Sequence, residues 1–337
     1  MGSAVGGWGE PETVYAVICT FRFLLGVGAG GIYPLAAVSA AGSSSRGEVN
    51  EAEVAQTVGK SFFWQSPGAL SPYLVALVVL QLPESETVTS VQFRWILGFG
   101  AVPAAVALWY TVARFAAETM PKPAATEAQG KGGGVRAHLR TLIGTGGTWF
   151  LFDVAYYGTL LFVPEILAEV MHADTLQETC LQTITVMMLG VVGNALSLLT
   201  LSYCSVRWLN AWGFVIQSVA FVLVGLVAML NPDSTSLLFA LVCLLMVSLT
   251  YGPNVATFIL PTVCFPAEVR STYHGLSAAC AKVGALCGAF LFAPIHDSFG
   301  IHVMMFVLSG VCAAGAMLSF GTLGVGVSTG GASYDPV

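Results

Sequence analysis

Two side chains of opposite charge stand inside long apolar stretches of this sequence. Asp153 lies within the apolar run 146–170, and Lys282 lies within the run 272–295. An ionisable group inside a membrane span is costly, so each one marks a candidate functional site. Arg22 has a similar position in the first apolar run, and we expect it to serve in gating or structure. A purely structural ion pair is the alternative for all three.

Two aromatic residues share a helix face with Asp153. Trp149 precedes it by four residues and Tyr157 follows it by four, so the three side chains stack along one side of a helix. This face presents an indole N–H, a carboxyl group and a phenol hydroxyl. Low-dielectric surroundings favour the neutral form of a carboxyl group, which suits a group that exchanges protons. The pattern predicts the wall of a polar cavity, with Asp153 as the proton-coupling residue.

Three other apolar runs carry a polar residue beside proline or glycine. Asn254 follows a Gly-Pro pair, Gln65 is followed two residues later by a Pro-Gly pair, and Tyr33 directly precedes a proline. Proline lacks the N–H donor of a helix and frees carbonyl groups, so each helix is expected to kink or unwind. Carriers place substrate sites at such broken helices, while a simple structural kink is the alternative.

The segments that carry these residues are long enough to cross a bilayer, which takes about 20 apolar residues. Nine runs qualify, over roughly 14–41, 60–82, 93–116, 146–170, 178–202, 207–230, 236–262, 272–295 and 300–325. They are too long and too uniformly apolar for the alternating strands of a barrel. The sequence therefore predicts an all-α, polytopic membrane protein with about nine transmembrane helices.

Basic residues predict how these helices are oriented. Nine lysines and arginines lie near span ends on one side, against Arg94 alone on the other. The nine are Arg46, Lys60, Arg114, Lys122, Lys131, Arg136, Arg140, Arg207 and Arg270. Short cytoplasmic loops carry an excess of lysine and arginine, so this side and the C-terminus are expected to face the cytoplasm. The acidic segments 83–92 and 171–177 are then expected outside.

A hydrophilic segment divides the predicted helices unequally. Residues 118–142 are rich in glycine, proline and charge, which is typical of a flexible cytoplasmic linker. We expect a partial N-terminal bundle of three spans over 1–117, a six-helix bundle over 143–326 and a cytoplasmic tail over 327–337. Such a linker normally separates equal halves, so three helices are expected to be absent before the first span.

Composition excludes several classes of function. Hydrophobic residues make up 56% of the chain and charged residues 9%, against about 25% charged residues in soluble domains. With 12 Lys+Arg against 18 Asp+Glu, there is no basic surface for nucleic acid. The eight cysteines form no CxxC pair and are expected to serve as packing residues. We expect no cofactor, no metal and no enzymatic activity.

Several segments resemble, in order and over nearly the whole chain, the phosphate:proton symporters of fungi and plants in the major facilitator superfamily. The most specific are Gly147-Thr-Trp-Phe-Leu-Phe-Asp153, Gly252-Pro-Asn-Val-Ala-Thr-Phe258 and Phe265-Pro-Ala-Glu-Val-Arg-Ser-Thr-Tyr-His-Gly275. The resemblance implies a major facilitator fold in which the nine spans correspond to helices four to twelve of twelve. It implies proton-coupled transport of inorganic phosphate by alternating access, with the plasma membrane as the expected location.

The resemblance also implies a set of site residues. The phosphate pocket would consist of Tyr33, Gln65, Trp149, Asp153, Tyr157, Asn254 and Lys282. Glu268 and Arg270 would help to close the cytoplasmic mouth. Two positions depart from the family: Ile32 replaces an acid associated with proton coupling, and a charged loop is reduced to Arg207. A facilitator of another small anion or a sugar, or a truncated phosphate sensor that does not transport, stays open as an alternative.

Overall fold

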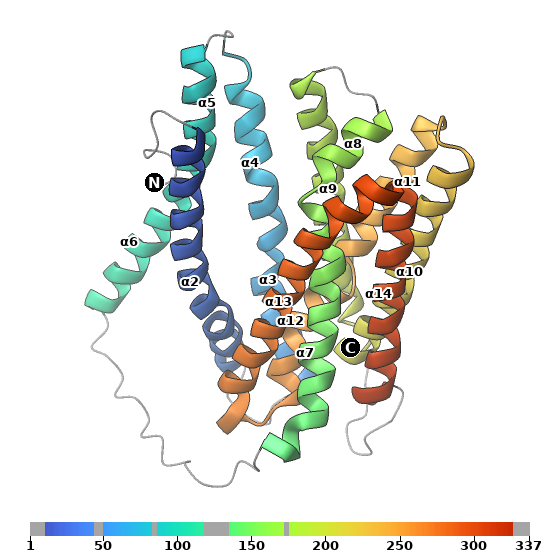
Figure 1. The fold of residues 1–337 in the computed structure, drawn as a ribbon. Coiled ribbons are helices and arrows are strands. Elements are labelled where there is room, and N and C mark those ends of the chain that lie inside the picture. The colour runs from blue at the N-terminus through green and yellow to red at the C-terminus, as the bar shows by residue number, and fades with distance from the viewer. Residues whose placement is uncertain (1–10, 44–49, 83–85, 118–134, 172–174, 326–337) are drawn as a thin grey trace. The chain divides into compact units, whose positions relative to one another are not determined.

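The computed structural model describes residues 11–43, 50–82, 86–117, 135–171 and 175–325, which form helices joined by short connections (Figure 1). The helices are α2 (Pro11–Ser43), α3 (Glu51–Phe63), α4 (Gln65–Val79), α5 (Glu86–Phe99), α6 (Ala101–Ala117), α7 (Val135–Leu160), α8 (Val163–Met171), α9 (Leu176–Thr200), α10 (Val206–Leu230), α11 (Thr235–Thr250), α12 (Pro253–Cys264), α13 (Ala267–Phe299) and α14 (Ile301–Thr322). These described ranges contain no strand, which confirms the predicted all-α class.

Eight helical segments among the described residues are long and apolar enough to cross a membrane. They coincide with eight of the nine predicted runs. Two of them combine consecutive helices, since Glu51–Val79 joins α3 to α4 and Thr235–Cys264 joins α11 to α12. The remaining run, 146–170, is occupied by the end of α7 and by α8. With 26 residues α7 is long enough to span, but its threonines, glycines and Asp153 lower its hydropathy.

Two of the three predicted helix interruptions are present. Trp64 separates α3 from α4, immediately before Gln65. Gly252 lies between α11 and α12 with a φ of 76°, a left-handed conformation that glycine adopts without a steric penalty. Pro253 then opens α12, where its missing N–H leaves no hydrogen bond unmade. Pro34, in contrast, lies inside the uninterrupted helix α2.

Packing divides the chain into two compact units. One comprises residues 1–30 and 68–132, and the other comprises residues 31–67 and 133–337. In the second unit α7 packs against α13 and α14, α10 packs against α11, α12 and α14, and α9 packs against α11. Helix α3 packs against α12 and α9 in the same unit. In the first unit α5 contacts α6.

The structure changes one boundary of the predicted domain organisation. Helix α7 begins at Val135, so residues 135–142 form its first turns rather than the end of a linker. The rest of the predicted linker, 118–134, and the predicted tail, 327–337, lie outside the described residues. The division into a bundle over 1–117 and a bundle over 143–326 stays a prediction.

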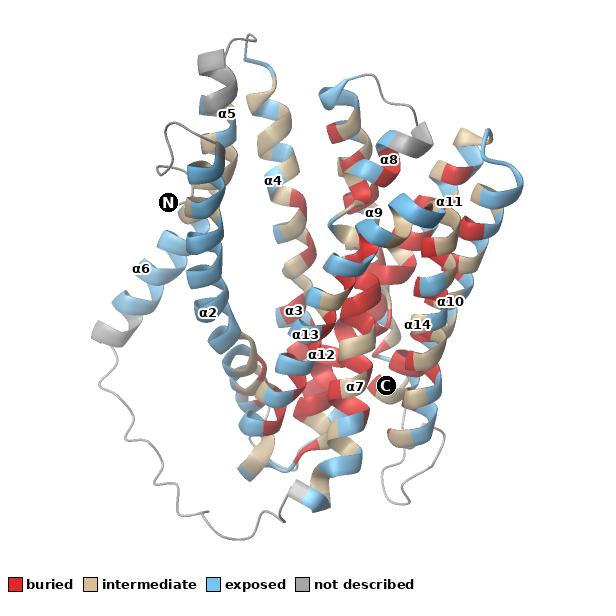
Figure 2. Cartoon of the chain, viewed as in Figure 1, coloured by how far each residue is buried: buried red, intermediate tan, exposed pale blue. Residues whose placement is uncertain are grey.

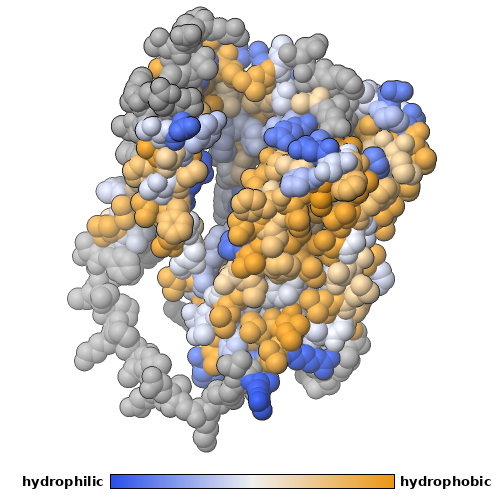
Figure 3. Space-filling model, in the orientation of Figure 1, coloured by the Kyte–Doolittle hydropathy of each residue, from blue (hydrophilic) through white to orange (hydrophobic). Residues whose placement is uncertain are grey.

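The second unit has a buried centre and an apolar outer surface. All ten residues from Pro253 to Thr262 of α12 are buried, and much of α7 is buried too (Figure 2). On the outside, Phe290 of α13 and Met317 of α14 are 71% and 69% exposed. Figure 3 shows hydrophobic surface across the middle of this unit, with hydrophilic atoms gathered at its two ends. An exposed apolar surface of this kind suits contact with lipid.

Candidate functional site

A close contact between α7 and α13 brings the two predicted charges together. Gly284 and Gly288 of α13 lie directly against the backbone of α7, because a Cβ atom at either position would overlap a carbonyl oxygen there. Glycines four residues apart allow membrane helices to approach this closely. Lys282 is two residues before Gly284, so the same contact holds its side chain against Asp153 of α7.

The ion pair between these residues lies at the centre of the site. Lys282 Nζ donates a hydrogen bond to Asp153 Oδ2 at 3.2 Å, and it also lies 3.5 Å from the hydroxyl oxygen of Tyr157. The ammonium group is 5.3 Å from the ring centre of Tyr33 and 5.0 Å from that of Tyr157, within range of a cation–π interaction. The Asp153 side chain is 4% exposed and that of Lys282 is 48% exposed. The cation is therefore oriented but still accessible.

A small cavity adjoins the ion pair. It is lined by Tyr33, Phe62, Gln65, Trp149, Phe152, Asp153, Tyr156, Tyr157, Asn254 and Lys282. All seven residues of the predicted phosphate pocket are in this set, and they come from α2, α4, α7, α12 and α13. The structure thus gathers them in one place, while their role in binding stays a prediction.

Two side chains of the cavity have an unused hydrogen-bonding atom. Gln65 Oε1 and Asn254 Nδ2 are buried and have no partner within the described part of the chain. Buried polar atoms are nearly always hydrogen-bonded, and each one left unpaired costs about 1–3 kcal/mol. One atom is an acceptor and the other is a donor. A ligand that offers both an O–H group and anionic oxygens would satisfy both.

Aromatic rings that were not predicted as site residues contact the side chains that line this cavity. The ring centre of Phe258 lies 5.7 Å from that of Tyr33, 4.8 Å from that of Phe62 and 6.1 Å from that of Trp149. His274 is fully buried, and its Nε2 donates to the carbonyl oxygen of Phe258 at 3.1 Å. His274 could have been found from sequence, because it lies eight residues before Lys282 of α13 and shares its helix face.

None of the residues predicted for gating is among those that line the cavity. Arg22 is exposed in the part of α2 that belongs to the first unit. Arg270 donates to the carbonyl oxygen of Phe265 at 3.3 Å, and Glu268 is exposed in the first turn of α13. The gating roles of these three residues stay predictions.

The second unit also contains an ion pair that was not predicted. Arg207 at the start of α10 lies 3.3 Å from Glu51 at the start of α3. The same guanidinium group is 3.9 Å from the sulfur of Cys264, at the end of α12. Arg207 therefore joins three helices at this end of the unit.

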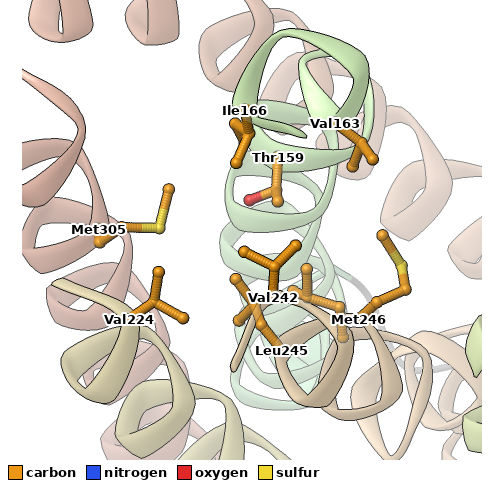
Figure 4. A pocket seen from close by; sticks show the side chains of 9 residues that line it. Thr159, Val163, Ile166, Val224, Val242, Leu245, Met246 and Met305 are labelled. Atoms are coloured by element: carbon orange, nitrogen blue, oxygen red, sulfur yellow. The ribbon is translucent and has the colours of Figure 1, made fainter. Parts of the chain in front are cut away.

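A second cavity in this unit is apolar (Figure 4). It is lined by side chains of α7, α8, α10, α11 and α14. The one hydroxyl group among its described lining residues belongs to Thr159 and already donates to the carbonyl oxygen of Ala155 at 2.9 Å. These lining residues therefore offer no group for an ion. The described residues also contain no cluster of three His, Cys, Asp or Glu side chains that could hold a metal.

Comparison with known proteins identifies the family of this chain. The family model described as Major Facilitator Superfamily matches residues 1–286. Inorganic phosphate transporter PT2 of Toxoplasma gondii is 35% identical over 329 residues, which cover 94% of this chain and 56% of that protein. Probable inorganic phosphate transporter 1-6 of Arabidopsis thaliana is 28% identical over 371 residues, covering 92% of this chain and 71% of that protein. Low affinity inorganic phosphate transporter 1 of Petunia hybrida is 30% identical over 352 residues, covering 84% of this chain and 63% of that protein. The chain thus spans just over half of the Toxoplasma relative.

Proposed function

We propose, since the chain belongs to the Major Facilitator Superfamily, that it transports inorganic phosphate together with protons. The family and the eight apolar helices make it an integral, multi-pass membrane protein. The observation that carries the proposal is that one cavity brings Lys282 together with Asp153, two tyrosines and two side-chain amides. The relatives named inorganic phosphate transporters support the choice of substrate.

Phosphate fits the chemistry of this cavity. The Lys282 ammonium supplies the opposite charge, and charge-assisted hydrogen bonds are the strong ones. Trp149, Tyr157 and Asn254 offer directed donors, which favour an oxyanion over a halide. Gln65 Oε1 is an acceptor and would bind an O–H group of protonated phosphate. Sulfate carries no such O–H group at neutral pH, so Gln65 would discriminate against it.

The ion pair supports the proposal of proton coupling. While Asp153 is ionised it occupies Lys282 and repels an incoming anion. Protonation of Asp153 removes the repulsion and frees the lysine for phosphate. Loss of that proton to the cytoplasm restores the negative charge, which expels phosphate on the same side. Rocking of the two halves around the central site would alternate access, as in other transporters built from repeats.

The proposal is tested by uptake of radiolabelled phosphate into vesicles that contain the purified protein. An alkaline interior should drive saturable accumulation, and a protonophore should abolish it. Arsenate should compete, because it has the shape and protonation of phosphate, whereas sulfate and chloride should compete poorly. Saturable binding without uptake would support a sensor instead. Uptake of a labelled sugar without phosphate uptake would refute the proposal.

One observation favours a second candidate, a passive phosphate facilitator. Ile32 stands where the family has an acid, and its side chain is 64% exposed beside Tyr33. Asp153 is then the one carboxylate that lines the cavity in the described part of the chain. A facilitator would equilibrate phosphate without accumulating it, so the same vesicles distinguish the two. We place the protein in the plasma membrane, which a fluorescent fusion would test.

A further inference from the structure

Behind the cavity, α9 and α10 carry three buried polar side chains that bond to the two helix interruptions. They are Asn194 and Ser197 of α9 and Gln217 of α10, here termed the backing cluster. All three are 0% exposed. None of them lines the cavity. Direct contact with a substrate therefore does not explain them.

Gln217 bonds to the end of α11, just before the interruption. Its Nε2 lies 3.0 Å from the carbonyl oxygen of Ser248, 3.3 Å from that of Tyr251 and 3.5 Å from that of Leu249. The last carbonyl groups of a helix have no partner within the helix and must be satisfied from outside. A single amide from the neighbouring helix does this here, which fixes where and in which direction α11 stops.

Ser197 and a glycine hold the other side of the same interruption. The Ser197 hydroxyl oxygen accepts a hydrogen bond from the N–H of Gly252 at 2.9 Å. Gly213 of α10 lies against the same residue, because a Cβ atom there would be 2.8 Å from Gly252 Cα. The chain is thus held from α9 and α10 two residues before Asn254, whose Nδ2 is an unpaired donor of the cavity.

Asn194 holds the interruption between α3 and α4 in the same way. Its Nδ2 donates to the hydroxyl of Ser66 at 2.9 Å and lies 3.4 Å from the carbonyl oxygen of Phe63. These two partners are the neighbours of Trp64 and Gln65. The second unpaired atom of the cavity, Gln65 Oε1, therefore also belongs to a residue that is held from behind by a buried amide.

We propose that the backing cluster positions the two amide side chains of the cavity, here termed the cavity amides. Asn194 positions Gln65, and Ser197 and Gln217 position Asn254. An apolar side chain would fill the same space without the cost of burying a polar group. Asn194 and Ser197 are three residues apart on α9, so one helix face joins both interruptions. This inference rests on the proposed function, because the cavity amides act on phosphate.

Double-mutant cycles on phosphate binding by the purified full-length protein test the inference. Gln217→Met and Asn194→Leu remove the backing amides, while Asn254→Ala and Gln65→Ala remove the cavity amides. Each backing substitution should weaken the phosphate Kd about tenfold, which corresponds to ~1.4 kcal/mol. When a backing substitution is combined with the loss of the cavity amide that it positions, the phosphate Kd should not rise any further. Combined with the other cavity amide, the effects should multiply to within about twofold.

A matched control comes from the next residue of α10. Ser218 exchanges hydrogen bonds with Ser309 of α14, at 3.1 and 2.9 Å, and it touches neither interruption. Ser218→Ala should therefore leave the phosphate Kd unchanged within about twofold. If Gln217→Met does not fold, Ser197→Ala serves instead, since it removes one oxygen atom from the same interruption. It should show the same non-additivity with Asn254→Ala.

The outcomes separate the inference from the proposed function. A parent protein that binds no phosphate contradicts the proposed function and the inference that depends on it. A parent that binds phosphate, with effects that multiply in every combination, contradicts only the positioning role. An unchanged Kd in Gln217→Met and in Asn194→Leu would contradict it too.

Discussion

Lys282 is the residue on which anion binding should depend. Lys282→Ala removes the ammonium group from the cavity, and hydrogen bonds to charged groups contribute about 1.5–3 kcal/mol. The phosphate Kd should rise by roughly 10- to 150-fold. Lys282→Arg should restore only part of the affinity, because the planar guanidinium group differs in reach and hydration. Titration of purified protein with phosphate measures this, and unchanged binding by the alanine variant would make Lys282 a structural residue.

Asp153 should make phosphate binding depend on pH. Asp153→Asn keeps the shape and hydrogen-bonding capacity of the protonated acid but cannot ionise. The two proteins should bind phosphate equally at about pH 5, and the variant should bind more tightly at about pH 8, where an ionised Asp153 repels the anion. The ratio of the two Kd values at each pH cancels the ionisation of phosphate itself.

Flux provides the complementary measurement for Asp153. Vesicles that contain the asparagine variant should exchange phosphate but should not accumulate it against a gradient, because no proton is bound and released in the cycle. Accumulation driven by pH in this variant would exclude Asp153 from the proton path. A ratio of affinities that stays flat across the pH range would do the same.

Side-chain spacing was sufficient to predict the hydrophilic half of this site. The four-residue intervals around Asp153, the proline and glycine pairs and the charge of Lys282 inside an apolar run pointed to seven residues that the structure gathers in one cavity. Phe258, Tyr156 and the backing cluster could not be recognised in the same way. In a membrane helix the outward and inward faces are both apolar, so periodicity does not reveal which aromatic ring faces a cavity.

At the scale of elements, the contact between α7 and α13 should tolerate no added atom. Gly288→Ala would place a methyl group against the carbonyl oxygen of Val154, and backbone on both sides cannot move aside. The helices must separate, with a cost of about 1–3 kcal/mol. Thermal unfolding in detergent should show a lower Tm, and phosphate binding should weaken because Lys282 moves away from Trp149 and Tyr157, the donors of α7 that line the same cavity.

A glycine of α14 provides the control for this substitution. A Cβ atom added at Gly310 would meet no atom of the described chain within 4 Å, so Gly310→Ala fits without a clash. Its Tm and phosphate Kd should match those of the parent. Equal behaviour of the two alanine variants would show that the glycine contact does not set the distance between the charges.

The elements themselves were largely predictable, because bilayer thickness fixes the length of an apolar run. Eight of the predicted apolar runs coincide with helical segments that, among the described residues, are long and apolar enough to cross a membrane. The predictions missed helix ends that extend beyond the apolar stretch, such as the first turns of α7 over 135–142. Hydropathy does not detect a helix that continues into polar sequence. The interruption at Gly252 was visible in sequence, but the side chains that hold it lie on other helices and depend on tertiary packing.

At the scale of the whole molecule, the predicted orientation can be tested on α10. The helix has 25 residues, a length of about 37 Å at 1.5 Å per residue, so its two ends should lie on opposite sides of the membrane. In a variant without native cysteines, Asp233→Cys should react with an impermeant maleimide from outside, and Tyr203→Cys should react only after permeabilisation. Both positions are exposed. The reverse pattern would invert the orientation derived from the basic residues.

Under the proposed function, the pairing of Asp153 with Lys282 should determine how membrane voltage acts on phosphate uptake. An empty cavity with both groups ionised contributes no net charge, and neither does a cavity that holds one proton on Asp153 and one monovalent phosphate. Voltage does work only on charge that crosses the field, about 2.3 kcal/mol per elementary charge per 100 mV. Uptake with one proton per phosphate should therefore be electroneutral and proceed equally at any potassium diffusion potential set across the vesicles. A rate that rises with an inside-negative potential would mean that a second proton travels with each phosphate.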